Sequence, residues 1–452
     1  MTRPRIDRPG KRMNHARSFL LFACGGPLAL GLAAACSDDP ARGEFEPSPD
    51  ASAPVPTANL PDAAAPTDAA TPSEPFDGSA EPVVCAVTPC AVELVAGANH
   101  FCARLSDGSV QCWGDDTNGA LGGGESTPAL GDDGGAATGP VEVVELTNAV
   151  QLTAAGHSTC ALLASGVARC WGSNAKGQLG LRTEEPFSDE AAHSTPADVV
   201  IAPLARIDLG LGSTCGVADA GDVHCWGDNS KGQLTRTEVA SSSGPVLADL
   251  DGPRVVRTGA STETGYALLE NGRLFTWGRT AARPSSIDVD PSPAMVPALA
   301  NVNDFAVGPA HACAAENGEL FCWGARDAPL CTGLPDAELE PRRAPVYGAG
   351  HVQQVSVSKN TTCVRLTSGE VQCCGKDDLG QLGIGDAGIR ELALRPASGV
   401  AHAVHVATAD EATCALLRDG VVTCWGGNAH GELGGATRDA LAHSIPSKVV
   451  FR

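Results

Sequence analysis

Residues 155–180 read AGHSTCALLASGVARCWGSNAKGQLG, and this stretch contains the features that decide the fold. Two short runs rich in small and apolar residues are separated by a turn that contains Gly166, and the second run ends in Cys170-Trp171-Gly172. Residues 174–180 suit a tight loop, because Asn and Gly tolerate positive φ and the leucine can enter a core. The pattern predicts a β-hairpin followed by a loop.

The same unit occurs seven times along the chain. Besides residues 170–172, Cys-Trp-Gly occurs at residues 112–114, 225–227, 322–324 and 424–426, and altered copies are Thr276-Trp277-Gly278 and Cys373-Cys374-Gly375. Successive copies lie 46 to 58 residues apart, and all six tryptophans belong to them. A unit of this size cannot bury its faces alone, so the repeats predict an all-β, seven-bladed β-propeller over residues 81–452. The tryptophans are then core residues between blades rather than ligand-stacking residues.

The small-residue strand, the Trp-Gly motif and the Asn-x-x-Gly-Gln-Leu-Gly loop together resemble the regulator of chromosome condensation repeat. Relatives of that repeat include bacterial proteins with the fold of the second β-lactamase inhibitory protein. The resemblance covers residues 91–452 and implies a seven-bladed β-propeller. Guanine-nucleotide exchange, the activity of the best-known member, is not expected here, because no exchange-site residues can be matched and an exported protein would not meet a nuclear GTPase.

Six of the repeats carry two cysteines that flank one hairpin. Directly opposed residues of an antiparallel pair lie close enough for a disulfide, so each pair is expected to form one. The pairs are Cys102–Cys112, Cys160–Cys170, Cys215–Cys225, Cys313–Cys322, Cys363–Cys373 and Cys414–Cys424. In the pair that is nine rather than ten residues apart, the hairpin centre falls on Asn317-Gly318, the preferred sequence of a type I′ turn. The fourth repeat has Tyr266 and Thr276 in place of both cysteines.

The remaining cysteines of the repeat region are fewer and less regular. Cys85 and Cys90 precede the first repeat and are expected to form a local bridge. Cys331 and Cys374 lie in neighbouring repeats, and a bridge between them is a hypothesis, since Cys374 stands where the other repeats have Trp. Zinc is the competing interpretation of the cysteines. It is disfavoured because structural zinc sites use closely spaced cysteines and four convergent ligands, which no repeat supplies.

The first 80 residues have a different character from the repeats. Residues 1–35 combine six basic side chains with an apolar run from residue 19, which is typical of a signal peptide rather than a membrane span. Leu32-Ala33-Ala34-Ala35-Cys36 resembles a bacterial lipobox, although Ala33 stands where Leu is usual, so a lipid on Cys36 is expected. The alternative is ordinary cleavage near Ala35 with a free Cys36, and Met13 offers an alternative start. Residues 36–80, rich in Pro, Ala and Asp, predict a disordered tether.

The net charge and the predicted location of the protein limit the partners that it can bind. The chain has 53 acidic against 31 basic side chains, a net charge of −22, which disfavours sequence-independent binding of nucleic acids. The sequence therefore predicts a monomeric lipoprotein of the cell envelope, attached to the outer membrane only by its lipid and facing the periplasm or the cell surface. Its expected partner is a neutral or basic envelope protein or polymer.

No recognised catalytic motif or cofactor motif occurs, so neither an enzymatic activity nor a cofactor is expected. The histidines at positions 100, 157 and 311 precede the first cysteine of their hairpins and could hold a metal in the channel, but hydrogen bonding to strand carbonyls is the favoured role. Residues 115–119 resemble half a calcium loop. Asn174 and Asn229 occupy the place of Asp116 in other repeats. The requirements of a tight turn therefore explain residues 115–119 better than calcium binding does.

Two long insertions separate the loop from the strand that follows it, at residues 123–139 and 181–195, whereas the third repeat has only residues 236–244. They are acidic, with Asp132 and Asp133 in the first. Glu184, Glu185, Asp189 and Glu190 surround Phe187 in the second, and we expect these five residues to bind the partner, with Phe187 as an exposed anchor. The alternative is that the insertions are merely solvated loops.

The expected function is a binding or scaffold module. The alternatives are a hydrolase or lyase with its site at the channel mouth, and an inhibitor of a periplasmic enzyme. A last expectation concerns the C-terminus, where residues 446–451 repeat the Pro-led strand that follows each loop. Because no eighth repeat follows, this strand is expected to pair with the first blade and close the ring.

Overall fold

The computed structural model describes residues 81–124, 139–201, 203–236, 240, 242–248, 250, 252–279 and 288–451. The predicted signal peptide, Cys36 and the tether lie outside these residues, as do Asp132 and Asp133. Among the described residues, no helix has the length and apolar character needed to cross a bilayer.

The described chain is almost entirely β-structure, with one short 3-10 turn, η1 (Thr117–Gly119). Blades 1 and 2 comprise β1 (Ala91–Ala96), β2 (His100–Leu105), β3 (Val110–Gly114), β4 (Val141–Glu142), β5 (Ala149–Ala155), β6 (Ser158–Leu163), β7 (Ala168–Ser173) and β8 (Ala192–Asp198). Blades 3 and 4 comprise β9 (Arg206–Leu209), β10 (Ser213–Val217), β11 (Val223–Gly227), β12 (Ser243–Leu247), β13 (Val255–Ala260), β14 (Thr264–Leu269), β15 (Leu274–Arg279) and β16 (Val289–Met295). Blades 5 to 7 comprise β17 (Val302–Val307), β18 (His311–Glu316), β19 (Glu319–Gly324), β20 (Glu338–Ala344), β21 (Val352–Val357), β22 (Thr361–Leu366), β23 (Val371–Gly375), β24 (Glu391–Pro396), β25 (Ala403–Thr408), β26 (Ala412–Leu417), β27 (Val422–Asn428) and β28 (Asp439–Lys448).

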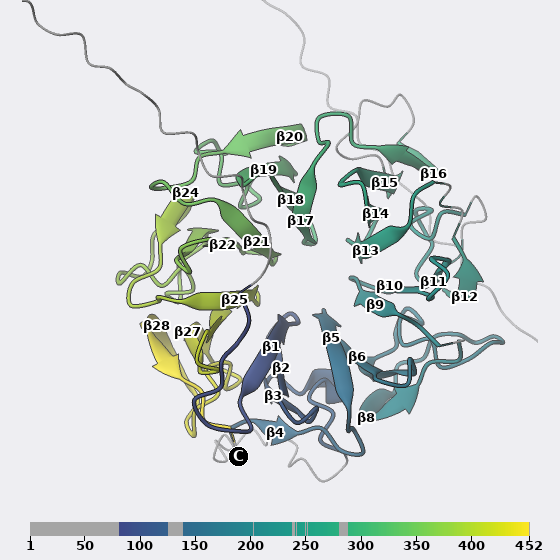
Figure 1. Cartoon of the computed structure of the whole chain (residues 1–452), viewed down its shortest axis with the longest axis horizontal. Helices are drawn as coiled ribbons and strands as arrows, with labels where there is room; N and C mark the ends of the chain where they lie inside the picture. Colours follow the sequence, from purple (N-terminus) through teal and green to yellow (C-terminus); the bar gives the residue numbers. More distant parts are fainter. Residues whose placement is uncertain are drawn as a thin grey trace, which may run out of the picture. The chain divides into compact units, whose positions relative to one another are not determined.

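Each blade is an antiparallel sheet of four consecutive strands, and the seven blades surround a central axis (Figure 1). The first strand of each blade faces the axis and the fourth lies at the rim (Figure 1). The chain therefore forms the seven-bladed β-propeller that the repeats predict.

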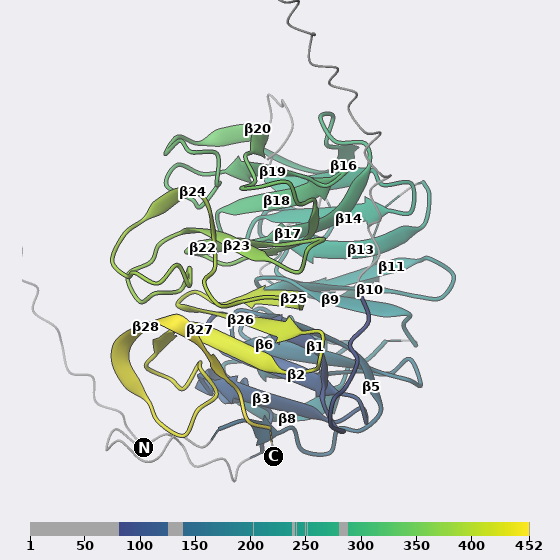
Figure 2. The ribbon, with the colours of Figure 1, turned by 60° about the vertical axis from the view of Figure 1, so that its left-hand side comes forward.

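The propeller has two faces, because consecutive antiparallel strands are joined at alternate ends (Figure 2). The loop face carries the connections between first and second strands, at residues 97–99, 156–157, 210–212, 261–263, 308–310, 358–360 and 409–411. The hairpin face carries the turns between second and third strands, at residues 106–109, 164–167, 218–222, 270–273, 317–318, 367–370 and 418–421. At the shortest of these turns, Asn317 and Gly318 both have positive φ, 50° and 82°, as a type I′ turn requires.

Disulfides join the second and third strands of six blades. The paired cysteines stand directly opposite in the register, for example Cys160 with Cys170, and their Cα atoms are 4.1 Å apart. The other five are Cys102–Cys112, Cys215–Cys225, Cys313–Cys322, Cys363–Cys373 and Cys414–Cys424. Two further disulfides are Cys85–Cys90 and Cys331–Cys374, the second of which joins blade 5 to β23 of blade 6.

The tryptophans form the contacts between blades. All six are at most 1% exposed. In five of them the indole N–H donates to a loop carbonyl of the preceding blade, as from Trp226 Nε1 to Gln178 O at 2.9 Å. The other four acceptors are Glu432 O for Trp113, Ala120 O for Trp171, Gln233 O for Trp277 and Gln381 O for Trp425. A buried indole N–H needs such an acceptor, so each tryptophan fixes one blade against the next.

The ring closes differently from the expectation that the last strand joins the first blade. β28 pairs with β27 in its own blade, and blade 1 is complete without it. Closure involves side-chain packing and backbone hydrogen bonds outside the sheets instead. Val449 and Phe451 pack with Trp113, whose indole N–H donates to Glu432 O at 2.9 Å, and Asp410 N donates to Ala98 O at 2.7 Å. Strand exchange is not needed, because each repeat already holds four strands.

Candidate functional site

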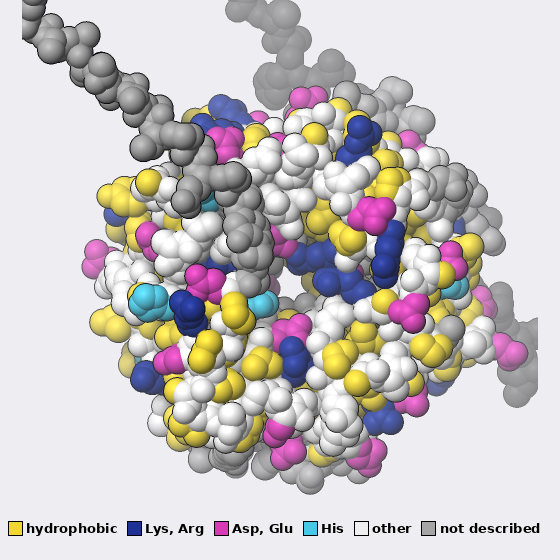
Figure 3. All heavy atoms as spheres, viewed as in Figure 1, with side chains coloured by type: hydrophobic (Ala, Val, Ile, Leu, Met, Phe, Trp, Pro, Cys, Tyr) yellow, Lys and Arg dark blue, Asp and Glu magenta, His cyan; other side chains and the backbone are white. Residues whose placement is uncertain are grey.

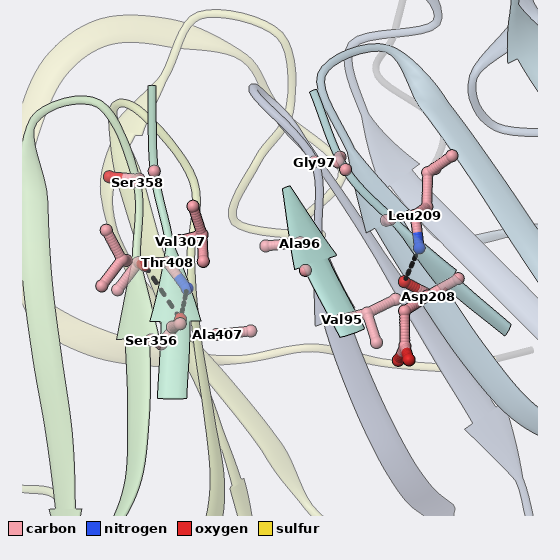
Figure 4. A pocket seen from close by; sticks show the side chains of 18 of the residues that line it. Val95, Ala96, Gly97, Asp208, Leu209, Val307, Ser356, Ser358, Ala407 and Thr408 are labelled. Carbon is pink, nitrogen blue, oxygen red and sulfur yellow. Dashed lines mark hydrogen bonds between the residues drawn. The ribbon is translucent and has the colours of Figure 1, made fainter. Parts of the chain in front are cut away.

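The central channel contains a candidate site. A cavity of about 270 Å³ is lined by the inner strands of all seven blades. Figure 4 shows this lining, in which small residues such as Ala96, Gly97 and Ala407 lie near polar ones such as Asp208, Ser356 and Thr408. Figure 3 shows basic and acidic side chains side by side around the central opening.

Each inner strand contributes one polar residue at the same register position. These seven residues, called the polar ring below, are Glu93, Gln151, Arg206, Arg257, Asp304, Gln354 and His405. Sequence analysis missed the ring, although its signal is visible as one polar residue two positions after the start of an apolar strand in nearly every repeat.

The polar ring joins neighbouring blades through backbone hydrogen bonds. Gln151 Nε2 donates to Ile207 O at 2.6 Å, and Gln151 Oε1 accepts from Ile207 N at 3.1 Å. Gln354 forms the same pair of bonds with Val406, at 3.2 and 2.9 Å. Glu93 Oε1 accepts from Leu152 N at 3.1 Å. Since inner strands of different blades do not share a sheet, these side chains satisfy backbone groups that would otherwise lack a partner.

One step along the strands, a second set of side chains repeats this arrangement. Thr153 Oγ1 accepts from Leu209 N at 3.0 Å, and Ser356 Oγ accepts from Thr408 N at 2.9 Å (Figure 4). Asp208 Oδ2 accepts from Thr258 N at 2.8 Å. The polar lining is therefore engaged in holding the blades together at two levels.

The charges of the ring are largely paired. Arg104 on β2 lies 2.8 Å from Glu93, Arg206 binds Asp208 at 2.8 Å, and Arg257 pairs with Asp304. The Asp208 carboxylate raises the pKa of Arg206. Desolvation, with the nearby arginine charges, lowers the pKa of His405 to about 4, so this imidazole is neutral at pH 7.

The histidines that were weighed as metal ligands lie apart. His100 Nε2 is 2.8 Å from Thr159 Oγ1 and His311 Nε2 is 2.7 Å from Thr362 Oγ1, so each binds a threonine hydroxyl of the following blade rather than a strand carbonyl. Burial lowers the pKa of His100 to about 4 and that of His311 to about 3. His157 stands at the surface, 3.9 Å from Asp115. Within the described ranges no three His, Cys, Asp or Glu side chains converge as a metal site.

The acidic side chains of the loop at residues 115–119 stabilise a tight turn. Asp116 Oδ1 accepts from Leu121 N at 3.0 Å, and Asn174 Oδ1 and Asn229 Oδ1 accept in the same way from Leu179 N and Leu234 N. The side chain at this position closes the loop so that its leucine is directed into the core.

The insertion of blade 2 is partly integrated into the fold. Glu184, Glu185 and Glu190 are exposed, as expected of an acidic surface. Phe187 is only half-exposed, and its ring lies so close to Gly244 in β12 that a Cβ at Gly244 would be 2.8 Å from it. The expectation of an exposed Phe187 anchor is therefore wrong, because the side chain is partly buried and its ring packs against the neighbouring blade.

Asp189 also has a structural contact in the insertion. Its Oδ2 accepts from Asn174 Nδ2 at 2.9 Å, and its Oδ1 lies 2.8 Å from His193 Nε2. Blade 7 repeats the arrangement with Asn428, Asp439 and His443. The Asp-x-x-x-His spacing, present in both repeats, was the signal that sequence analysis missed, and it ties the loop to the outer strand.

Comparisons with known proteins agree with this architecture. The profile of the family described as "Regulator of chromosome condensation (RCC1) repeat" matches residues 91–120, 205–233 and 352–381. Three segments of the chain thus match the RCC1 repeat. This propeller is similar to yeast RCC1 (Prp20) in its complex with Kap60, with a TM-score of 0.63 and 17% identity over 80% of this chain and 85% of that one. A second structure, of Prp20p from Saccharomyces cerevisiae, gives a TM-score of 0.62 and 18% identity over 82% of this chain and 88% of that one.

Curated relatives match part of the chain at moderate identity. The mouse E3 ubiquitin-protein ligase HERC2 is 29% identical over 290 residues, 61% of this chain and 6% of that protein. The mitochondrial RCC1 domain-containing protein RUG3 of Arabidopsis thaliana is 26% identical over 55% of this chain and 57% of its own length. Protein pim1 of Schizosaccharomyces pombe is 25% identical over 55% of this chain and 49% of its own length. The chain thus spans less than two thirds of each of these relatives.

Proposed function

We propose that this RCC1 propeller is a non-catalytic binding module, held at the cell envelope by a lipid on Cys36 and by the tether of residues 36–80. The observation that carries the proposal is an asymmetry: the chain enters the propeller at the hairpin face, while the exposed acidic insertion leaves from the loop face. Prp20p, whose structure was determined together with its binding properties to Gsp1p and histones, supports a protein-binding role for an RCC1 propeller.

The segment that leads into the first blade is fixed by contacts with blade 7. Val84 N donates to Arg418 O at 2.7 Å and Ala86 N to Asp419 O at 3.3 Å, while Glu81 pairs with Arg418 at 3.2 Å. Residues 418–421 form the turn between β26 and β27, so this segment lies on the hairpin face.

The acidic insertion starts from the opposite face. Ser173, at the end of β7, donates its N–H to His157 O in the connection of the loop face at 2.9 Å. The following loop holds the insertion, since Asp189 N donates to Asn174 O at 3.2 Å. Because Phe187 is packed and Asp189 is engaged, the exposed Glu184, Glu185 and Glu190 carry the interaction with a basic partner. Exposed charges of this kind act mainly on the association rate.

Reversing the charge of the insertion should weaken partner binding. A partner captured from envelope extract by the 81–452 fragment would be purified, and its affinity measured for Glu184→Lys/Glu185→Lys against the parent. At low salt we expect a loss of affinity of about tenfold or more, mainly through slower association, because steering of a basic partner is lost. The matched control is Asp219→Lys/Asp222→Lys, two exposed acids on the hairpin face. Equal losses in both variants, or none in the first, would contradict the proposal.

Cys36→Ala should release the protein from the membrane fraction or leave the precursor uncleaved. A lipid on Cys36 supplies the only hydrophobic anchor in the proposal, and an acidic tether adds no attraction to anionic lipids. Fractionation after salt and carbonate washes measures the result, and Cys24→Ala provides a cysteine control within the predicted leader. Retention of processed Cys36→Ala protein in the washed membranes would show that the anchor is not this lipid.

A further inference from the structure

The loops of blades 2 and 7 are tied to their outer strands by the same polar cross-link. In blade 2, Asn174 Nδ2 donates to Phe187 O at 3.2 Å and to Asp189 Oδ2 at 2.9 Å. The other oxygen of Asp189 lies 2.8 Å from Nε2 of His193. Blade 7 contains the equivalent set Asn428, Thr437, Asp439 and His443. An asparagine amide is therefore the donor that joins loop and strand.

Blade 6 keeps the backbone of this arrangement but replaces all three side chains of the cross-link. Asp377 Oδ1 accepts from the N–H of the loop leucine at 2.8 Å, as the asparagine Oδ1 does elsewhere. Gly388 N donates to Asp377 O at 2.7 Å, the bond that Asp189 N makes in blade 2. Glu391 stands opposite Gly375 in the register, as the histidines of blades 2 and 7 stand opposite the equivalent glycines. Asn, Asp and His are thus replaced by Asp, Gly and Glu.

This replacement leaves one oxygen of Asp377 without a partner. The residue is fully buried, and its Oδ2 has no hydrogen-bond partner among the described residues. Because Oδ1 is held as in the asparagines, Oδ2 takes the position of the amide nitrogen. That nitrogen donates to the carbonyl two residues before the aspartate, and the equivalent carbonyl in blade 6 is that of Asp386. Two acceptors then face each other without a donor, which is costly for a buried charged group.

The surrounding charge is negative and is not neutralised by ion pairs. The acidic residues of this loop are Asp377, Asp378, Asp386 and Glu391. Burial, together with the other three carboxylates, raises the pKa of Asp377 to about 6. Of the two basic residues between positions 376 and 391, Lys376 is exposed, and Arg390 lies 3.8 Å from Asp327 of blade 5 and donates to its carbonyl. A cation would relieve both the missing donor and the repulsion.

The loop also has room for a ligand where blade 2 has the Asp189 side chain. A Cβ at Gly388 would have no atom within 4 Å, and residues 385–390 are exposed. The groups around this space offer carboxylate and carbonyl oxygens, without the nitrogen or sulfur ligands that transition metals favour. Calcium takes about six to eight oxygen ligands in flexible geometry and accepts water among them.

We propose that this loop of blade 6 binds a calcium ion between the carboxylates of Asp377 and Glu391 and the carbonyl oxygen of Asp386. The ion takes the place of the asparagine amide and joins the loop to β24, as the Asn-Asp-His cross-link joins loop and outer strand in blades 2 and 7. Water supplies the remaining ligands on the exposed side of the loop. The site is separate from the acidic insertion of blade 2 and does not depend on partner binding.

The test compares unfolding of the full mature chain with CaCl₂, with MgCl₂ and with neither. A dissociation constant of about 10⁻⁴ to 10⁻³ M, the range of extracellular calcium modules, predicts that about 10 mM calcium lowers the unfolding equilibrium constant about tenfold to hundredfold. Magnesium should have a much smaller effect, because it demands octahedral geometry and gives up its water reluctantly. Isothermal calorimetry should show one saturable calcium site.

Asp377→Asn is the decisive variant, because it restores the residue that blades 2, 3 and 7 already contain and should therefore fold. We expect it to be at least as stable as the parent without calcium and to lose the calcium effect, and Glu391→Gln should weaken that effect. The matched control, Asp219→Asn/Asp222→Asn, removes two exposed acids of the hairpin face and should leave it unchanged.

Two results would overturn the proposal. Equal stabilisation of the parent and Asp377→Asn by calcium, or equal stabilisation of the parent by calcium and magnesium, would show only general screening of an acidic chain. A parent that does not respond to calcium, but is less stable than Asp377→Asn, would show that no cation occupies the space beside Asp377.

Discussion

Replacing Cys331 and Cys374 by serine should lower the free energy of unfolding by about 4 kcal/mol, since this disulfide closes a segment with a sequence separation of 43 residues. It is the one disulfide among the described residues that joins two blades. It stands where other junctions have a tryptophan, so its loss also leaves a gap at the blade 5–6 junction. Equilibrium urea unfolding under non-reducing conditions measures the change.

The geometry explains why the two cysteines occur together. Cys331 follows the loop leucine and has a φ of 56°, and at the equivalent position Gly180 has a φ of 65°. A Cβ on Gly180 would lie 2.6 Å from Trp226 Nε1, so a tryptophan excludes a side chain there. With Cys374 in place of the tryptophan, the space is free for the side chain of Cys331. We therefore expect Cys331→Gly/Cys374→Trp to recover part of the stability that the serine pair loses.

Two controls calibrate this result. Removing Cys102–Cys112, which are ten residues apart, should cost about 3 kcal/mol by the same estimate, and removing Cys85–Cys90, which are five apart, about 2 kcal/mol. If the Cys331–Cys374 variant loses no more than the Cys85–Cys90 variant, the interblade disulfide does not constrain the ring.

Deleting residues 446–452 should lower the midpoint of thermal unfolding by roughly 6 °C, which corresponds to about 4 to 5 kcal/mol in a protein of this size. The deletion removes the pairing of Ser447 with Cys424 and the buried Val449. It also removes Phe451, whose ring centroid lies 5.8 Å from that of Trp113 in blade 1. The loss acts at the closure of the ring, where no continuous sheet joins the first and last blades.

Single substitutions distinguish two effects of the deletion, the loss of contacts that close the ring and the shortening of β28. Phe451→Ala should account for about 1 to 3 kcal/mol of the loss, because it removes an aromatic contact between blades 7 and 1. Ile445→Ala, which is 73% exposed in β28, should have almost no effect. Equal effects would instead indicate closure by the segment that precedes β1, where Val83 packs on the same core.

Local features were predictable from the sequence because each is encoded within about ten residues. The spacing of Cys160 and Cys170 determines a hairpin register, and Asn317-Gly318 determines its turn. The Asn-x-x-Gly-x-Leu loop specifies both its own hydrogen bond and the direction of its leucine. Repetition at a blade-sized period then implies stacking, because a lone four-stranded sheet with two apolar faces cannot bury them. The number of blades and their internal pairing follow from these short patterns.

Contacts between blades were decided only by the tertiary structure. The sequence predicts an exposed Phe187 anchor, but the arrangement of the seven blades places Gly244 of β12 against its side chain. The sequence suggests that the last strand belongs to blade 1, but blade 1 is already complete, so Val449 and Phe451 of the last segment cross the junction as side chains rather than as a strand. The polar ring depends on residues about fifty positions apart. Sequence patterns do not determine such contacts, because they arise from the rigid placement of whole blades around a closed ring.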